Sequence, residues 1–195
     1  MPRAFVAILL DPETRDAVTA ELERLRPLSR AVAWVPRDNL HVTLRFLGDQ
    51  TDERLADALA ALDTAAAGGE PFTLGLHGLG AFPGLERPRI FWVGIAEGAL
   101  AARGLQARLE SELGACGFPL ETRPWHPHLT VGRVFDDRRW RREITPALRQ
   151  ALAQAGTRPV ARLPIRVISL MKSDLGPAGA RYTELASRAL GSRIG

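Results

Sequence analysis

The sequence predicts an α+β fold: a bilobal domain with two pseudo-symmetric lobes of antiparallel sheet, flanking helices and a central cleft. Strand and helix candidates occur in mixed order with hairpins, which favours antiparallel sheets over a doubly wound parallel sheet. The order strand–helix–strand–helix occurs once in each half of the chain. A pattern of histidine, apolar residue, threonine and apolar residue also occurs once in each half, at 41–44 and 128–131. We therefore expect a single bilobal catalytic domain over residues 1–195.

The first elements follow from simple local signals. A continuous apolar run at 5–10 (FVAILL) is typical of a buried strand. Asp11 and Pro12 then provide an N-cap and a first-turn proline for a helix that a further proline ends. A short strand is expected at 33–35, before the first motif strand at 39–47.

The middle of the chain predicts a helix and two strands. Thr51 or Asp52 caps the helix, whose leucines recur at helical spacing. Strands are expected at 72–79 and 90–95, joined by a loop at 80–89 that is rich in glycine and proline. The remaining elements, in chain order, are a helix at 98–114, the second motif strand at 128–134, one helix at 139–155, a strand at 165–172, a turn at 176–179 and a last strand at 181–189.

Composition indicates a globular, modestly basic protein. The formal net charge is +4, with 25 arginines and a single lysine, which suits an anionic ligand such as RNA, although solvated helix arginines explain most of them. The one cysteine, Cys116, excludes an intramolecular disulfide and fits a reducing compartment. No signal-peptide pattern and no membrane-length apolar run is present. We expect a cytoplasmic monomer with no membrane partner.

The repeated motif carries the chemistry. Strand side chains alternate between faces, so His41 shares a face with Thr43, and His128 shares a face with Thr130. If composition alone decided the sequence, the chance that two of the four histidines begin this pattern would be roughly one in a thousand. Two histidines can act as a base and an acid, and two hydroxyls can bind an anion. These four side chains are typical of proton-transfer chemistry on a phosphate. Spacing alone does not decide which histidine donates the proton.

Two arginines near the motifs have different strand parity. Strict alternation puts Arg133 on the face opposite His128, and we predict that Gly132 allows a bulge or strand end that turns Arg133 into the cleft. Arg45 has the parity of His41, so it is either a second contact to phosphate or RNA, or a solvated strand arginine.

At these residues the chain resembles the 2H phosphoesterases, and within them the RNA 2′,3′-cyclic phosphodiesterase branch, historically named 2′-5′ RNA ligase. The segments that carry the resemblance are FVAILL, WVPRDNLHVTLRFLGD around the first motif, LGAFP at 79–83, PRIFWVGI at 88–95, HPHLTVGRV at 126–134 and LMKSDLGPAGARYTELA at 170–186. They are collinear and cover essentially the whole chain.

The resemblance implies hydrolysis of a 2′,3′-cyclic phosphate at an RNA end to a 2′-phosphate, with reversible 2′-5′ joining of RNA ends in some members. By analogy, His41 is the general acid and His128 is the general base. Thr43, Thr130 and Arg133 then bind the phosphate. No metal or other cofactor is expected, since a single extra charge in the transition state is matched by hydroxyls and one arginine.

Besides Arg45, three residues are candidate RNA contacts. Phe46 has the parity of the core face, yet an aromatic near this place can stack on a nucleobase in the family. Trp125 precedes the second motif in a loop with two prolines, where it either packs or stacks on a base. His126 shares the parity of His128. It could line the cleft, or the two histidines could be mistaken for a pair of metal ligands.

Other functions compete with this interpretation. A 2H phosphodiesterase could act on ADP-ribose cyclic phosphate or on 2′-5′ oligoadenylate instead. A non-catalytic RNA-binding module is disfavoured because both motifs are intact. A metallohydrolase using His126 and His128 lacks the clusters of carboxylates and histidines that metal sites need.

Overall fold

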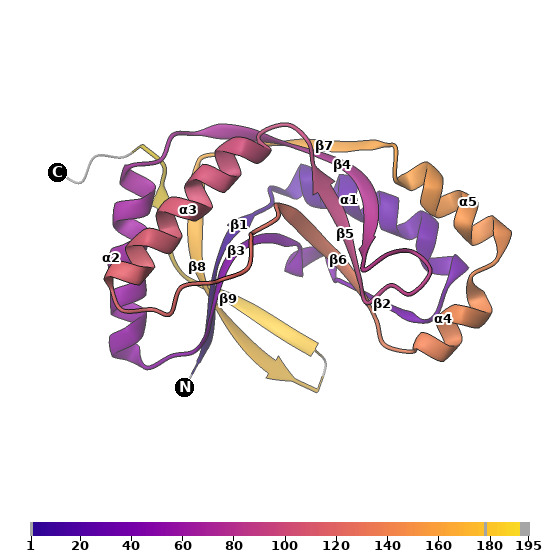
Figure 1. Cartoon of the computed structure of the whole chain (residues 1–195), viewed down its shortest axis with the longest axis horizontal. Helices are drawn as coiled ribbons and strands as arrows, with labels where there is room; N and C mark the ends of the chain where they lie inside the picture. The colour runs from indigo at the N-terminus through magenta and orange to yellow at the C-terminus, as the bar shows by residue number, and fades with distance from the viewer. Residues whose placement is uncertain (1, 178, 192–195) are drawn as a thin grey trace.

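The computed structural model describes residues 2–177 and 179–191 and has the predicted α+β architecture (Figure 1). Two antiparallel sheets lie next to each other, one of four strands and one of five. Helices cover their outer faces. A cavity lies where the two sheets meet, so the expectation of two antiparallel lobes around a cleft is confirmed.

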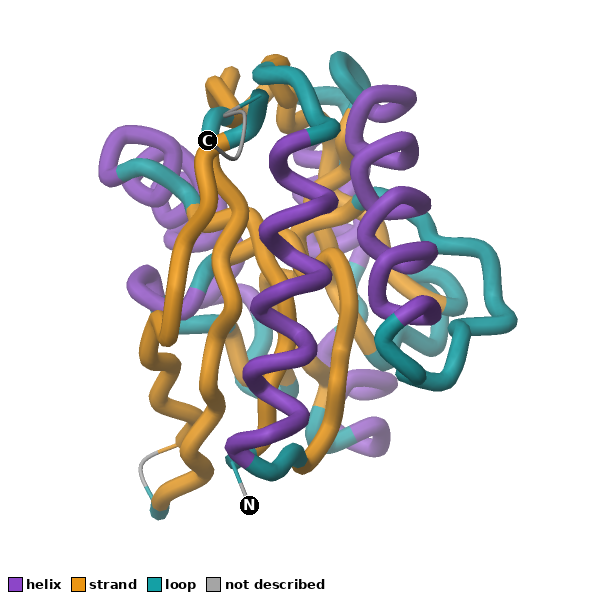
Figure 2. The backbone as a smooth tube through the Cα atoms, turned by 90° about the vertical axis from the view of Figure 1, so that its left-hand side faces the viewer, coloured by secondary structure: helices purple, strands orange, loops and turns teal. Residues whose placement is uncertain are grey.

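The four-stranded lobe contains the first motif strand at its edge. Its strand order is β3-β1-β8-β9. The strands are β1 (Arg3–Leu9), β3 (His41–Asp49), β8 (Val167–Gly176) and β9 (Gly179–Ala189). Two helices, α2 (Asp52–Ala67) and α3 (Ala99–Ala115), lie side by side over the outer face of this sheet (Figure 2).

The five-stranded lobe contains the second motif strand. Its order is β2-β6-β5-β4-β7. The strands are β2 (Val32–Trp34), β4 (Phe72–Phe82), β5 (Ile90–Ile95), β6 (His128–Val134) and β7 (Pro159–Ile165). The helices of this lobe are α1 (Pro12–Leu25), α4 (Asp137–Glu143) and α5 (Pro146–Ala155), and two short 3-10 turns lie at Arg26–Leu28 and Arg37–Asn39.

The lobes do not correspond to the two halves of the sequence. Helix α1 follows β1 of the four-stranded sheet but packs against β7 of the other sheet. Helix α3 follows β5 of the five-stranded sheet but packs against α2 and β3. Both lobes therefore depend on elements from both halves, and one continuous apolar core joins them.

Helix starts were predicted well because caps are local. The Asp11 side chain accepts a hydrogen bond from the Thr14 N–H at 2.7 Å, and Thr51 rather than Asp52 caps α2. The single helix expected at 139–155 is wrong, because the Thr145 hydroxyl caps a new helix whose first residue is a proline.

Strand boundaries needed three corrections. The sequence analysis missed β7, which contains Pro159 and Pro164 and is tolerated because it is an edge strand. The strand expected at 165–172 is β8, which runs from Val167 to Gly176. Residues 80–82 belong to β4 rather than to the loop. The predicted turn at 176–179 joins β8 to β9, and its Ala178 lies outside the described residues.

Among the described residues, no helix combines the length and the apolar character that crossing a membrane requires. Cys116 is a partly exposed free thiol at the end of α3, where it packs against the core.

Candidate active site

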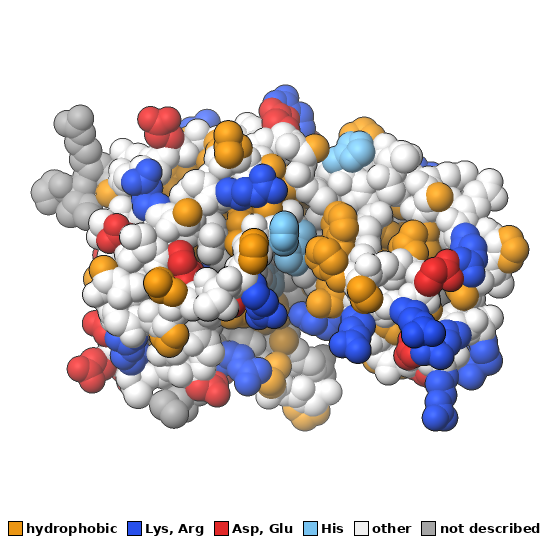
Figure 3. Space-filling view, viewed as in Figure 1, with side chains coloured by type: hydrophobic (Ala, Val, Ile, Leu, Met, Phe, Trp, Pro, Cys, Tyr) orange, Lys and Arg blue, Asp and Glu red, His pale blue; other side chains and the backbone are white. Residues whose placement is uncertain are grey.

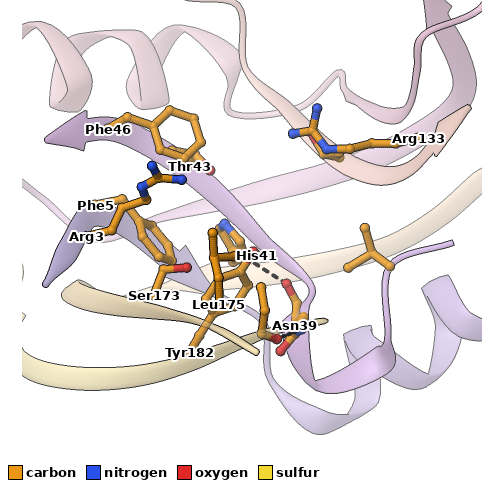
Figure 4. A pocket seen from close by; sticks show the side chains of 13 residues that line it. Arg3, Phe5, Asn39, His41, Thr43, Phe46, Arg133, Ser173, Leu175 and Tyr182 are labelled. Atoms are coloured by element: carbon orange, nitrogen blue, oxygen red, sulfur yellow. Dashed lines mark hydrogen bonds between the residues drawn. The ribbon is translucent and has the colours of Figure 1, made fainter. Parts of the chain in front are cut away.

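The two motif strands meet at the junction of the lobes. Strand β3 contacts β6 there, and both contribute side chains to a cavity of about 370 Å³, which we call the His41 cavity. Its lining includes His41 and Thr43 from β3, and Thr130 and Arg133 from β6. In Figure 4 the Arg133 side chain lies across the cavity from His41 and Thr43. Thr43 and Thr130, which are 87 positions apart in the sequence, thus line the same cavity.

Both motif histidines make the same local hydrogen bond. The Nδ1 atom of His41 lies 2.8 Å from the carbonyl oxygen of Asn39, a contact drawn in Figure 4. The Nδ1 atom of His128 lies 2.7 Å from the carbonyl oxygen of His126. A carbonyl oxygen can only accept, so Nδ1 carries a hydrogen in both rings. This assignment leaves Nε2 as the atom that exchanges a proton with a ligand.

Aromatic rings hold His41 in place. The ring of Phe5 lies 4.9 Å from that of His41, and the single tyrosine of the chain, Tyr182, meets His41 edge-on at 5.2 Å. The ring of Phe82 meets that of His128 edge-on at 5.9 Å. Sequence reasoning placed Phe5 in the core and did not single out Tyr182. Both rings reach His41 through sheet pairing, which one sequence does not reveal.

The surroundings of His41 favour its neutral form. Burial lowers the pKa of the His41 imidazole, the positive charge of Arg15 lowers it further, and the hydrogen bond to Asn39 opposes both effects. The net direction is downward, so His41 is mostly neutral at neutral pH in the free protein. A bound anion would reverse this balance, because a negative charge favours the imidazolium.

This direction predicts a titration result. In the free protein, the His41 ring resonances are expected to titrate below the ordinary histidine pKa of about 6.5, and a saturating nucleoside 2′-monophosphate should move the midpoint upward. Proton NMR with a His41→Gln variant for assignment measures both midpoints. A free-protein midpoint at or above the ordinary value would contradict the environment described.

Each motif strand has a β-bulge directly after its threonine. In β3, Thr43 pairs with Ala7 and Arg45 with Val6, which leaves Leu44 as the extra residue. In β6, Thr130 pairs with Trp92 and Gly132 with Phe91, which leaves Val131 as the extra residue. The bulges reverse the alternation beyond this point. The third residue after each threonine therefore lies on the same side of the sheet as the motif.

The bulges decide where the flanking residues lie. Arg133 lines the His41 cavity, so the prediction that an irregularity near Gly132 brings it into the cleft is confirmed. Phe46 is the corresponding residue of the first motif; it lines the same cavity and is 63% exposed, so of the two alternatives left open for it, the core position that its parity suggested is wrong. Sequence reasoning allowed for the bulge in β6 but not for the one in β3.

Arg45 lies outside the cavity. Its Nε atom lies 2.9 Å from the Glu110 carboxylate on α3, and both side chains are about 15% exposed, at 14% and 16%. It also donates to the carbonyl oxygens of Phe46 and Pro119. The expectation that Arg45 shares the face of His41 and Thr43 is therefore wrong, because the bulge at Leu44 turns it toward the helices.

The side chains of β2 leave no room for a Cβ atom at position 132, so glycine is needed there. A Cβ atom at this position would lie 2.9 Å from Cε3 of Trp34 and 2.9 Å from Cγ1 of Val32. Gly132→Ala is expected to destabilise the fold by about 1–3 kcal/mol and to displace Arg133. Urea unfolding measures the loss. Gly104→Ala in α3 is the matched control, since a Cβ there meets nothing within 4 Å, and it should stabilise the helix slightly. Equal stability of the Gly132→Ala variant and the native chain would contradict this packing.

The two remaining candidates have different surroundings. Trp125 is partly buried, and its indole N–H donates to the carbonyl oxygen of Thr43 at 3.1 Å, so it ties the loop before β6 to the first motif strand. His126 is exposed and lines, with His128, a second cavity of about 340 Å³, which we call the His128 cavity. No cluster of three or more metal-ligating side chains occurs among residues 2–177 and 179–191.

A bilobal α+β fold in which each lobe presents a histidine and a threonine from one strand, at the place where the two strands meet, defines the class of 2H phosphoesterases. Comparison with known proteins gives the family within this class. The model of the 2′-5′ RNA ligase superfamily matches residues 14–177, and the chain belongs to this superfamily.

Curated relatives and solved structures match over nearly the whole chain. An RNA 2′,3′-cyclic phosphodiesterase of Methanothermobacter thermautotrophicus is 33% identical over 183 residues, which cover 94% of this chain and 96% of that protein. An RNA 2′,3′-cyclic phosphodiesterase of Thermus thermophilus is 35% identical over 187 residues, with coverage of 94% and 87%. The crystal structure of E. coli LigT complexed with 3′-AMP has a TM-score of 0.76 and 26% identity, with coverage of 98% and 100%.

Proposed function

We propose that this protein hydrolyses 2′,3′-cyclic phosphate ends of RNA to 2′-phosphates without a metal ion. The observation that carries the proposal is the junction of the lobes, where β3 contacts β6 and where His41, Thr43, Thr130 and Arg133 line one cavity. His128 lies two residues before Thr130 on β6 and lines the second cavity. The naming of the relatives as RNA 2′,3′-cyclic phosphodiesterases supports the same substrate. Action on another phosphodiester, such as a 2′-5′ oligonucleotide, is the alternative that the test below separates.

Thr43, Thr130 and Arg133 are the proposed phosphate ligands. A cyclic phosphodiester has one negative charge and gains a second in the transition state. One guanidinium and two hydroxyls match this charge at fixed positions, which is the most effective form of electrostatic stabilisation. The three side chains come from both lobes and line the same cavity, which supports a single phosphate between the motif strands.

The two histidines are proposed to act on opposite sides of the phosphorus. Attack on a cyclic phosphate is in line, so the attacking water and the departing O3′ lie opposite each other. O2′ and O3′ belong to the same ribose. The departing O3′ therefore stays attached to the nucleoside, on the side of the phosphorus where the nucleoside is bound. His41 lines the cavity of about 370 Å³, which has an aromatic wall, whereas His128 lines the separate His128 cavity. This arrangement supports His41 as the general acid and His128 as the general base.

The depressed pKa of His41 is compatible with an acid role once substrate is bound. The free imidazole is neutral because of burial, and the phosphate anion supplies the charge that favours its protonated form. The proton then moves to O3′ as the P–O3′ bond breaks. Because the acid is charged only beside the phosphate, hydrolysis depends on a proton taken up on binding, which predicts tighter binding of substrate at lower pH.

The nucleobase is proposed to stack in the aromatic part of the His41 cavity. Phe46 is exposed there, and its ring lies 6.1 Å from that of Phe5. Phe5 in turn contacts Tyr182 at 5.1 Å. An exposed aromatic ring supported by others is a typical platform for a base in single-stranded RNA.

The direct test is turnover of an oligoribonucleotide with a 2′,3′-cyclic phosphate end, in the presence of EDTA, with the product isomer identified. We expect a 2′-phosphate product at an unchanged rate in EDTA. A 2′-5′ oligoadenylate of the same length is the matched control and should remain intact. Failure to open the cyclic end, or preferential cleavage of the 2′-5′ oligonucleotide, would overturn the proposal.

A further inference from the structure

We propose that an arginine-rich surface of the five-stranded lobe, which begins at Arg133 in the His41 cavity, holds the backbone of the RNA strand on the 5′ side of the cyclic phosphate. This inference rests on the proposed function and adds to it the part of the substrate that lies outside the cavity. The partner is the sugar-phosphate chain of a single strand, which is contacted through its charge rather than through its base sequence.

A strand that ends in a 2′,3′-cyclic phosphate continues in only one chemical direction. The ring closes the 3′ end, so the rest of the strand extends from the 5′-oxygen of the last nucleoside. Each further nucleotide adds one negatively charged phosphate. Arg133 lies across the cavity from His41 and Thr43 (Figure 4), so a strand that leaves the cavity over Arg133 passes onto the five-stranded lobe.

Five more exposed arginines surround the end of β6 and helix α4. The loop at 83–89 is held against α4, because the indole N–H of Trp140 donates to the carbonyl oxygen of Leu85 at 3.3 Å. The segment before β2 is held there too, because the Glu143 carboxylate accepts a hydrogen bond from the backbone N–H of Arg30 at 2.9 Å. We define the arginine surface as Arg30, Arg87, Arg89, Arg133, Arg138 and Arg142, all of which are exposed.

The positive charge of this surface is available to a ligand. Within residues 2–177 and 179–191, none of its six arginines forms an ion pair. By contrast, their neighbours Arg139 and Arg141 pair with Glu143 and Asp137 at 3.4 Å and 2.6 Å. Residue 30 and the segments 86–89 and 133–149 together contain nine arginines and four acidic residues, a formal charge of +5 against +4 for the whole chain. The net positive charge is thus concentrated here, where it attracts phosphates.

The charge forms a band that begins at the cleft and includes an aromatic ring. In Figure 3, arginine and lysine side chains extend from the lower edge of the central hollow to the lower right, where α4 lies in Figure 1. Phe135 lies between Arg133 and α4 in the chain and is 64% exposed, and its backbone N–H donates to the carbonyl oxygen of Ala31 at 3.1 Å. An exposed ring within an arginine-rich segment suits an unpaired base beside its phosphates.

The test compares the KM of a mononucleoside 2′,3′-cyclic phosphate with the KM of a single-stranded oligoribonucleotide that ends in the same cyclic nucleotide. For the native protein, we expect the oligonucleotide to have the lower KM by about tenfold or more at low salt, and this difference should disappear at high salt. The mononucleotide has no phosphate that reaches the arginine surface, so its KM reports the cavity alone.

The double variant Arg138→Glu/Arg142→Glu reverses two charges on α4. It is expected to raise the KM of the oligonucleotide about tenfold or more, with kcat and the KM of the mononucleotide within about twofold of native. The slope of log KM against log salt concentration should fall by about 1.4, since each lost contact to a single strand removes about 0.7. Phe135→Ala is expected to raise the KM of the oligonucleotide about fivefold or more.

Two features keep this test independent of folding. Trp140, which is 1% exposed and anchors α4 in the core, is unchanged, and circular dichroism checks the fold of each variant. The milder variant Arg138→Gln/Arg142→Gln should change the KM in the same direction by a smaller factor. The matched control is Arg108→Glu/Arg166→Glu, which alters the net charge equally at two exposed arginines outside the arginine surface and both cavities, and its KM for the oligonucleotide should stay within about twofold of native.

The outcomes separate this inference from the proposed function. Equal KM values for the oligonucleotide and the mononucleotide at low salt would overturn the arginine surface and leave the proposed function standing. An α4 variant that behaves like the Arg108→Glu/Arg166→Glu control would overturn it as well. Protein that opens neither substrate contradicts both.

Discussion

His128→Ala is expected to lower the rate of cyclic phosphate hydrolysis by about 10²–10⁴-fold while the protein stays folded. His128 is proposed to take the proton of the attacking water, and alanine has no group that can replace it. The side chain is not part of the main apolar core, so its removal should cost little stability. Single-turnover hydrolysis of a cyclic-phosphate oligonucleotide measures the rate, and circular dichroism checks the fold.

A control histidine is available in the same lobe. His77 on β4 is exposed and lies outside both cavities of the cleft, so His77→Ala should keep the native rate within about twofold. The acid–base account would be contradicted by a His128→Ala variant that keeps the native rate. It would also be contradicted by a His77→Ala variant that loses as much activity as His128→Ala.

Arg133→Ala is expected to lower the hydrolysis rate by about 10²–10³-fold, as removal of one fixed donor to a developing oxyanion typically does. Arg133→Lys should restore part of this loss, because lysine supplies the charge without the planar pair of donors. The thermal midpoint of both variants should stay close to that of the native protein, since Arg133 is exposed in the absence of ligand.

Arg45 is expected to behave differently from Arg133, although it also lies shortly after the threonine of its motif. Its partner is Glu110 on α3, so Arg45→Ala should destabilise the protein by about 1–3 kcal/mol through the unpaired carboxylate. The folded variant should still turn over substrate. Steady-state kinetics beside urea unfolding separate the two arginines. A loss of catalysis in Arg45→Ala equal to that in Arg133→Ala would show that the bulges do not divide their roles.

The sequence predicted the two His-Thr pairs because strand alternation is a local rule. Any strand over 41–44 places His41 and Thr43 on one face, whatever the rest of the fold does. Arg133 was placed correctly because Gly132 marks a position where a strand can become irregular. No residue at the first motif signals the bulge at Leu44 in this way, because leucine fits a regular strand as well as a bulge. Parity therefore failed for Arg45 and Phe46.

Long-range pairing explains the other omissions. Phe5 and Tyr182 flank His41, although they lie near opposite ends of the chain, because β1 lies between β3 and β8 in the sheet and β9 follows β8. Periodicity does not encode strand order, so no single sequence places them together. Strand β7 was missed for a different reason: its two prolines indicate a loop, and only its edge position makes a strand possible.

The two histidines are proposed to act on opposite sides of the phosphorus: His41 on the departing O3′, and His128 on the attacking oxygen. A cyclic phosphate with sulfur in place of O3′ tests this assignment directly, because a thiol has a pKa of about 8.5 and its thiolate leaves without a proton donor. We expect His41→Ala to hydrolyse this substrate within about tenfold of the native rate, while His128→Ala stays at least about a hundredfold slower. Rescue of His128→Ala instead of His41→Ala, or of neither variant, would contradict the claim.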